Sequence, residues 1–194
     1  MGSSTHRPTD DAFVRDYNHA VELGAAGDLP GAIAKTRGLC TRYPTDAAAW
    51  SHLSALLIRQ KDYRGALAAA QDALARDPEH PNAHINAGVA ARGLGDLETA
   101  RRHLEEAVHI APSDPDAQLQ LGGTLVRLHQ MYAAIAAYIR AIGEAHREEG
   151  RSELLIERSV DGLAAVTPST PLAEPLRSLC DGVRWLTTGE PGSI

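Results

Sequence analysis

The stretch HPNAHINAGVAARGLGDLETA, residues 80–100, decides the fold, because it has helical spacing yet carries small residues where a packed helix usually has leucine. Gly88, Ala91, Gly95 and Ala100 all fall within it. A glycine inside a helix costs up to about 1 kcal/mol relative to alanine. Such residues are favoured where a second helix passes closely, so the stretch predicts tight helix–helix contacts.

The sequence repeats itself with a period of 34 residues. ALARDPEH (73–80) aligns with AVHIAPSD (107–114), and KDYRGALAAAQDA (61–73) aligns with GDLETARRHLEEA (95–107). Extending this frame gives four units, 13–46, 47–80, 81–114 and 115–148. Each unit is predicted to be a pair of helices separated by a turn, such as the Gly-Asp pairs at 27–28 and 95–96.

Small residues recur at the eighth, twentieth and twenty-seventh positions of the units, and proline at the thirty-second. Of these sixteen positions fourteen fit, the exceptions being Leu39 and His146; the others are Ala20, Ser54, Gly88, Gly122, Ala32, Ala66, Ala100, Ala134, Ala73, Ala107, Ala141, Pro44, Pro78 and Pro112. This pattern resembles the tetratricopeptide repeat family. The resemblance implies an all-α fold, a right-handed α-solenoid of antiparallel helix pairs.

The pattern has a physical explanation. Gly88 and Ala100 are expected to meet where their two helices cross at short distance. Pro81 and Pro115 are expected in the first turn of a helix, behind His80 and Asp114, where a missing N–H costs nothing. Larger apolar residues are predicted to form the surrounding core: Trp50, Leu53, Leu57, Leu74, Leu121, Leu125 and Tyr138.

Segments outside the repeats are expected to differ in character. Residues 1–12 are predicted to be a flexible segment and 188–194 a flexible tail. Residues 149–187 are predicted to form capping helices, which cover the apolar end of a repeat array; the alternative is that they join the array to a partner. The last predicted helix carries an apolar side made of Leu172, Leu176, Leu179, Val183 and Leu186.

Composition excludes several functions. The formal charge of −6 disfavours nucleic-acid binding. No stretch approaches the length of a membrane span, and the start lacks a secretory signal, so we expect no membrane association and a cytoplasmic protein. Myristoylation of the N-terminus is not expected, because His6 stands at the position where that signal needs Ser or Thr. Cys40 and Cys180 are far apart and are expected to be buried free thiols.

No catalytic motif is present, since the chain lacks a phosphate-binding loop, a His-Glu-x-x-His sequence and a G-x-S-x-G sequence. His80 and His84 have a four-residue spacing, but His80 precedes its helix, and His103 and His109 are on different sides of theirs. We therefore predict no metal, no cofactor and no enzyme activity.

Function is instead expected on a surface. In the family that the chain resembles, the first helix of each unit lines a concave groove that holds a peptide. The sixth position of each unit lies on that helix and is Asn18, His52, Asn86 or Gln120. This row resembles the asparagine ladder of the repeat domain in O-linked N-acetylglucosamine transferase, which holds a peptide backbone. Amide side chains can pair with both backbone groups of a peptide. A solvated face without a ligand is the alternative.

Three arginines, Arg59, Arg92 and Arg127, are expected near the far ends of these helices. They could favour an acidic ligand or pair with aspartates of the chain itself. The lysine clamp of related chaperone adaptors is not predicted, because Asn82 and Ser51 occupy such places. Asn82 is included in the predicted groove.

Three functional hypotheses remain. The first is a non-catalytic adaptor that binds an extended segment of another protein in the groove, an acidic segment being the kind that the three arginines could favour. The second is an accessory domain or subunit that delivers substrates to a transferase or oxygenase. The third is a self-assembling scaffold, a homo-oligomer formed through the C-terminal helices.

Overall fold

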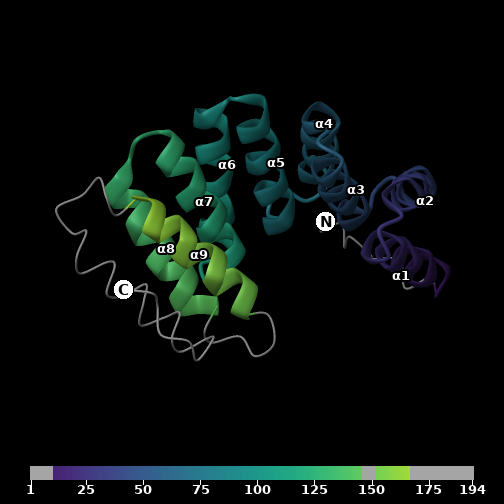
Figure 1. The fold of residues 1–194 in the computed structure, drawn as a ribbon. Coiled ribbons are helices and arrows are strands. Elements are labelled where there is room, and N and C mark those ends of the chain that lie inside the picture. The colour runs from purple at the N-terminus through teal and green to yellow at the C-terminus, as the bar shows by residue number, and fades with distance from the viewer. Residues whose placement is uncertain (1–10, 146–151, 167–194) are drawn as a thin grey trace. The chain divides into compact units, whose positions relative to one another are not determined.

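The computed structural model describes residues 11–145 and 152–166, which form α-helices joined by short turns (Figure 1). Within these ranges there are nine helices and no strands. Their bounds are α1 Asp11–Ala25, α2 Leu29–Arg42, α3 Ala47–Arg59, α4 Tyr63–Leu74, α5 Pro81–Leu94, α6 Leu97–Ile110, α7 Pro115–Arg127, α8 Met131–Ala145 and α9 Ser152–Val166. The last helix predicted from the sequence, which carries Leu172 to Leu186, lies outside the described residues.

The chain forms two compact units, Met1–Gly95 and Asp96–Ile194. In the first unit α1 packs on α2, α2 on α3, α3 on α4, and α5 on both α3 and α4. In the second unit α6 packs on α7, α7 on α8, and α9 on both α7 and α8. The boundary falls inside the third predicted repeat, so the expected contact between Gly88 and Ala100 stays a prediction.

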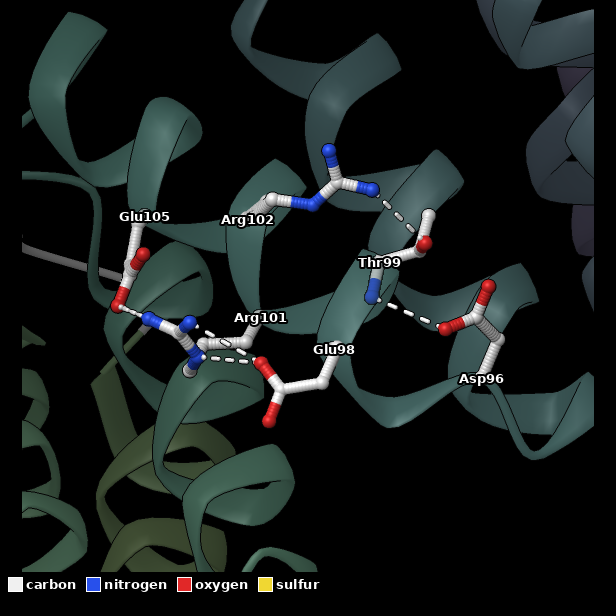
Figure 2. Close-up of polar contacts among 6 residues, drawn as sticks. All are labelled: Asp96, Glu98, Thr99, Arg101, Arg102 and Glu105. Carbon is white, nitrogen blue, oxygen red and sulfur yellow. Dashed lines mark hydrogen bonds and ion pairs between the residues drawn. The ribbon is translucent and has the colours of Figure 1, made fainter.

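Acidic residues begin most of the helices. An aspartate carboxylate accepts a hydrogen bond from a backbone N–H of the first turn at the start of α2, α3, α4, α6 and α7, and these residues are Asp28, Asp46, Asp62, Asp96 and Asp114. Figure 2 shows one of them, Asp96, accepting from the Thr99 amide at 3.1 Å. At α5 the Nδ1 of His80 takes this role, accepting from the Ala83 amide at 3.3 Å. Each cap satisfies a helix N–H that has no partner inside the helix.

The turn inside each helix pair uses the left-handed backbone conformation. Gly27 and Gly95 both have a φ of 88°, as a Gly-Asp turn permits. The equivalent residues of the second and fourth pairs are Lys61, with a φ of 65°, and His129, with a φ of 58°. The turn geometry therefore repeats every 34 residues whether or not glycine is present.

Small residues sit where helices of a pair approach closely. The hydroxyl of Ser54 on α3 donates to the carbonyl of Ala66 on α4 at 2.7 Å. In the second unit a Cβ on Gly122 of α7 would lie 2.8 Å from the Tyr138 ring of α8. Both positions need a small residue, so the structure explains the glycine and serine at the eighth position of their repeats. Leu53 and Leu57 are buried beside the first of these crossings, as expected for core residues.

Candidate functional site

The predicted row of polar residues is divided between the two units. Asn18 on α1, His52 on α3 and Asn86 on α5 belong to the first unit, whereas Gln120 on α7 belongs to the second. Asn18 is exposed, and the other three are half-buried. The first unit therefore carries three residues of the row on three of its helices.

Asn86 links α5 to α3 by a side-chain hydrogen bond. Its amide nitrogen donates to the backbone carbonyl of Ser51 at 3.0 Å and approaches the Ser51 hydroxyl at 3.4 Å. Ser51 is buried, so the bond takes the place of a hydrogen bond to water. The side chain thus has a structural partner through its nitrogen, and its oxygen is the group to consider for a ligand.

His52 lies between α3 and α1. Its ring centroid is 5.1 Å from that of Tyr17 on α1, with the two ring planes tilted by 47°. Burial lowers the pKa of His52 below its ordinary value of 6.5, and the positive charge of Arg59 lowers it further. The imidazole is therefore neutral near pH 7, with one nitrogen as donor and the other as acceptor.

One nitrogen of this imidazole has no partner. In the described part of the chain the buried Nε2 of His52 makes no hydrogen bond. An unpartnered buried polar group is uncommon, because its loss of hydration is not compensated. His52 is therefore the residue of the row whose bonding capacity the fold leaves most clearly unused.

His52 and Asn86 make equivalent contacts one repeat apart. Each contacts the residue 35 positions earlier, Tyr17 for His52 and Ser51 for Asn86, on the preceding first helix. Tyr17 and Ser51 occupy the fifth position of their repeats, outside the row of residues predicted from the sequence. Only the 34-residue spacing between Tyr17 and Ser51 could have indicated these two residues from the sequence.

Tyr17 belongs to a small aromatic cluster at the start of the chain. Phe13 on the same helix stacks on it at 5.8 Å, and Phe13 meets the ring of Tyr43 edge-on at 5.0 Å. Phe13 is buried and Tyr17 is half-buried, so Tyr17 packs against Phe13 as well as against His52. Aromatic pairs of this kind add specific geometry to apolar packing.

Gln120 in the second unit has a partner within its own helix. Its Nε2 donates to the Asp116 carboxylate at 3.0 Å, and its backbone carbonyl accepts from the Thr124 hydroxyl at 3.0 Å. Nearby on α7, Gln118 is 2% exposed, and within the described residues its Oε1 has no hydrogen-bond partner. No feature of the sequence pattern distinguishes Gln118 from other core positions.

The predicted arginines and Asn82 have different surroundings. Arg59 donates from Nη2 to the backbone carbonyl of Gly24 at 2.9 Å, at the C-terminal end of α1. It therefore stabilises a helix end of its own chain through a carbonyl, rather than through an aspartate. Arg92 is half-buried in the last turn of α5, Arg127 is exposed in the last turn of α7, and Asn82 is exposed in the first turn of α5.

His80 and His84 contact backbone groups of their own chain, and the thiol of Cys40 is buried. His84 places its Nε2 2.9 Å from the Pro78 carbonyl, close to the helix cap made by His80. Among the described residues no group of three or more His, Cys, Asp or Glu side chains is arranged to hold a metal ion. Cys40 is buried and free, and burial raises its thiol pKa to about 12. Cys180 lies outside the described residues.

Over the described ranges, no helix is both long enough and apolar enough to cross a bilayer.

Comparison with known sequences gives one family. A sequence model of the family described as "Tetratricopeptide repeat" matches residues 17–81, 56–115 and 85–146. No curated protein matches the sequence.

Comparison with solved structures gives proteins of the same architecture. MamA residues 41 to the end from Desulfovibrio magneticus RS-1 has a TM-score of 0.61 and 21% identity, over 71% of this chain and 78% of that one. TTC0263, a thermophilic TPR protein of Thermus thermophilus, has a TM-score of 0.62 and 18% identity, over 88% and 98%. The first TPR of Spaghetti (RPAP3) bound to HSP90 peptide SRMEEVD has a TM-score of 0.57 and 18% identity, over 60% and 93%. These similarities confirm the predicted all-α fold of helix-pair repeats.

Proposed function

The chain belongs to the tetratricopeptide repeat family, and from that premise we propose that it is a non-catalytic adaptor that binds an extended segment of another protein. The proposed contact surface is the face of the Met1–Gly95 unit that carries Asn18, His52 and Asn86 on α1, α3 and α5. We call this surface the first-helix face. A solved neighbour, the first TPR of Spaghetti, holds an HSP90 peptide, which supports a peptide as the class of ligand.

The observation that carries the proposal is the unpartnered Nε2 of His52, in the middle of this row. A neutral imidazole can meet either a peptide N–H or a peptide C=O, depending on its tautomer. We propose that ligand binding turns the half-buried ring so that Nε2 reaches the ligand. A ligand would then provide the hydrogen bond that the described part of the chain does not.

The neighbouring side chains complement this chemistry. The amide oxygen of Asn86 can accept a ligand N–H while its nitrogen stays bonded to Ser51. Exposed Asn18 can both donate and accept. Groups that pair with backbone amides hold a peptide without requiring a particular side chain. Because Arg59 is bonded to the Gly24 carbonyl, the proposal assigns recognition to the ligand backbone rather than to acidic side chains.

A selected peptide tests the proposal. A library of 12-residue peptides would be selected on the wild-type protein, and the best binder measured by fluorescence anisotropy against Asn18→Ala, His52→Ala and Asn86→Ala. One hydrogen bond contributes about 1 kcal/mol net, so each substitution should weaken binding about fivefold. Gln71→Ala, an exposed residue of α4, is the matched control and should leave affinity unchanged.

The ligand itself provides the sharper comparison. N-methylation of single backbone amides of the peptide should weaken binding strongly, whereas single alanine substitutions of its side chains should have smaller effects. Melting curves by circular dichroism would show whether Asn86→Ala stays folded after losing the Ser51 bond. Unchanged binding by Asn18→Ala and His52→Ala, both folded, would mean that the first-helix face is not the binding site.

A further inference from the structure

The outer face of α8 differs from that of the other second helices. The residues at the eighteenth and twenty-fifth positions of a repeat lie on this face and are exposed in all four pairs. In the first three pairs they are Pro30 and Arg37, Arg64 and Gln71, and Glu98 and Glu105. In the fourth pair they are Tyr132, 64% exposed, and Ile139, 42% exposed. Two large apolar side chains thus stand at solvent-facing positions where the other pairs have five polar residues and one proline.

The equivalent face of α6 carries charged residues at these positions. There Arg101 bonds to Glu98 at 3.0 Å and to Glu105 at 2.7 Å, as Figure 2 shows. Arg102 on the same face bonds to the Thr99 hydroxyl at 3.0 Å. Such a charged face is suited to water. Ala136 of α8 corresponds to Ala34 of α2 and Ala68 of α4, so what distinguishes α8 is the pair of large apolar residues, Tyr132 and Ile139.

Continuation of the repeat array does not cover these positions. In the first unit α2 is followed by the helices α3 and α4, yet Pro30 and Arg37 remain exposed. In the second unit α6 is followed by α7 and α8, yet Glu98 and Glu105 remain exposed. A further helix pair after α8 would therefore leave Tyr132 and Ile139 exposed as well. Helix α9, the part of the predicted capping segment that the structure describes, leaves both side chains exposed.

The face forms a stripe with internal symmetry. Tyr132, Ala136, Ile139 and Gly143 recur at steps of four, three and four residues, so they lie on one side of the helix. Tyr132 and Gly143 are equally far from the midpoint of this stripe, and so are Ala136 and Ile139. If two copies of α8 pack antiparallel about that midpoint, Tyr132 of each copy meets Gly143 of the other, and Ile139 of each copy meets Ala136 of the other. A stripe with this order of sizes is complementary to itself, as a two-fold interface requires.

We propose that this chain self-associates by antiparallel pairing of the α8 stripe, Tyr132, Ala136, Ile139 and Gly143, with the same stripe of a second copy. One helix face buries less than the roughly 1,200 Å² of a stable interface, so the dimer is expected to be weak and to form only at high protein concentration. Self-association through α8 is independent of the first-helix face, which is in the other unit.

Analytical ultracentrifugation of the full chain from about 5 µM to 1 mM tests the proposal. The mean mass should rise with concentration, and Tyr132→Glu and Ile139→Glu should each raise the dissociation constant at least about tenfold, because a charge would be buried at the contact. Gln71→Glu places the same charge at the equivalent exposed position of α4 and should leave association unchanged. A monomer over the whole range, or association that both α8 variants retain, would overturn the proposal.

Cross-linking tests the antiparallel register in a Cys180→Ser background. Two copies of position 136 would lie three residues apart along the helix axis, about 4.5 Å, whereas two copies of position 143 would lie about 16 Å apart. Ala136→Cys should therefore form a disulfide-linked dimer on mild oxidation, and Gly143→Cys should not. Equal cross-linking at both positions would contradict the antiparallel pairing.

Discussion

Replacing Gly162 with alanine should destabilise the Asp96–Ile194 unit, because the ring of Tyr138 occupies the space that the new methyl group needs. A Cβ built on Gly162 of α9 would lie 2.5 Å from Cε1 of Tyr138 and 2.8 Å from its hydroxyl oxygen, whereas ordinary contacts are 3.4–4 Å. Gly122 of α7 also lies against the ring, since a Cβ built on it would be 2.8 Å from Cε1. Tyr138 is 5% exposed, so a shift of the ring must displace packed neighbours.

The magnitude follows from two opposing effects. The ring or α9 must shift by about 1 Å, and overpacking of this kind costs about 1–3 kcal/mol. Alanine regains up to about 1 kcal/mol of helix propensity over glycine. The net loss should be about 1–2 kcal/mol, which for a unit of this size lowers the melting temperature by roughly 5–10 °C.

Thermal and urea unfolding followed by circular dichroism at about 5 µM, below the range of the proposed dimer, would measure this loss. Gly143→Ala is the matched control, since a Cβ on Gly143 meets nothing within 4 Å and should stabilise the unit. In a Tyr138→Leu background the penalty of Gly162→Ala should shrink, because the ring is absent. An equal penalty with and without the ring would refute the packing argument.

Three further predictions concern single residues. Lys61→Gly and His129→Gly should each stabilise their turns by up to about 1 kcal/mol, since both backbones are left-handed; a lower melting temperature would contradict this. Cys40, whose pKa is raised to about 12, should resist iodoacetamide at pH 8 in folded Cys180→Ser protein, and rapid labelling would refute its burial. The lowered pKa of His52 gives stability that is present above pH 6.5 and lost as pH falls from 6.5 toward the folded-state pKa. The unfolding free energy of His52→Gln should therefore depend less on pH between 5 and 7, and an unchanged dependence would exclude His52 as the cause.

The fold was predictable because its determinants are local and periodic. Pro81 and Pro115 begin α5 and α7, as the sequence predicts, and His80 and Asp114 cap these helices. The left-handed turn at Lys61 was not predictable, because lysine gives no indication of a positive φ. It is imposed by the helices on either side, which must reverse direction in the same number of residues as at Gly27. The boundary between the two compact units, which falls between α5 and α6, could not be predicted either, because the 34-residue pattern continues through it unchanged.

The candidate site was predictable only in part. The sequence indicates which helix carries Asn86, but its bond to Ser51 depends on how α5 lies against α3 and on the side-chain rotamer. The same is true of Arg59, whose partner is a backbone carbonyl that no residue type could indicate. A backbone partner is invisible to pattern analysis, because every residue has a carbonyl.

The two faces of the helix pairs place different demands on the sequence. His52 and Asn86, at the sixth positions of their repeats, contact the preceding first helix, so a polar residue there can serve the fold alone. The outer positions of the second helices contact no neighbouring helix closely enough to become buried, so the fold accepts arginine, glutamine or glutamate there equally well. Tyr132 and Ile139 at such positions expose apolar surface and gain little from packing within the chain. Among the described residues no helix buries these two side chains, and they are therefore the residues on which the proposed pairing of two α8 stripes rests.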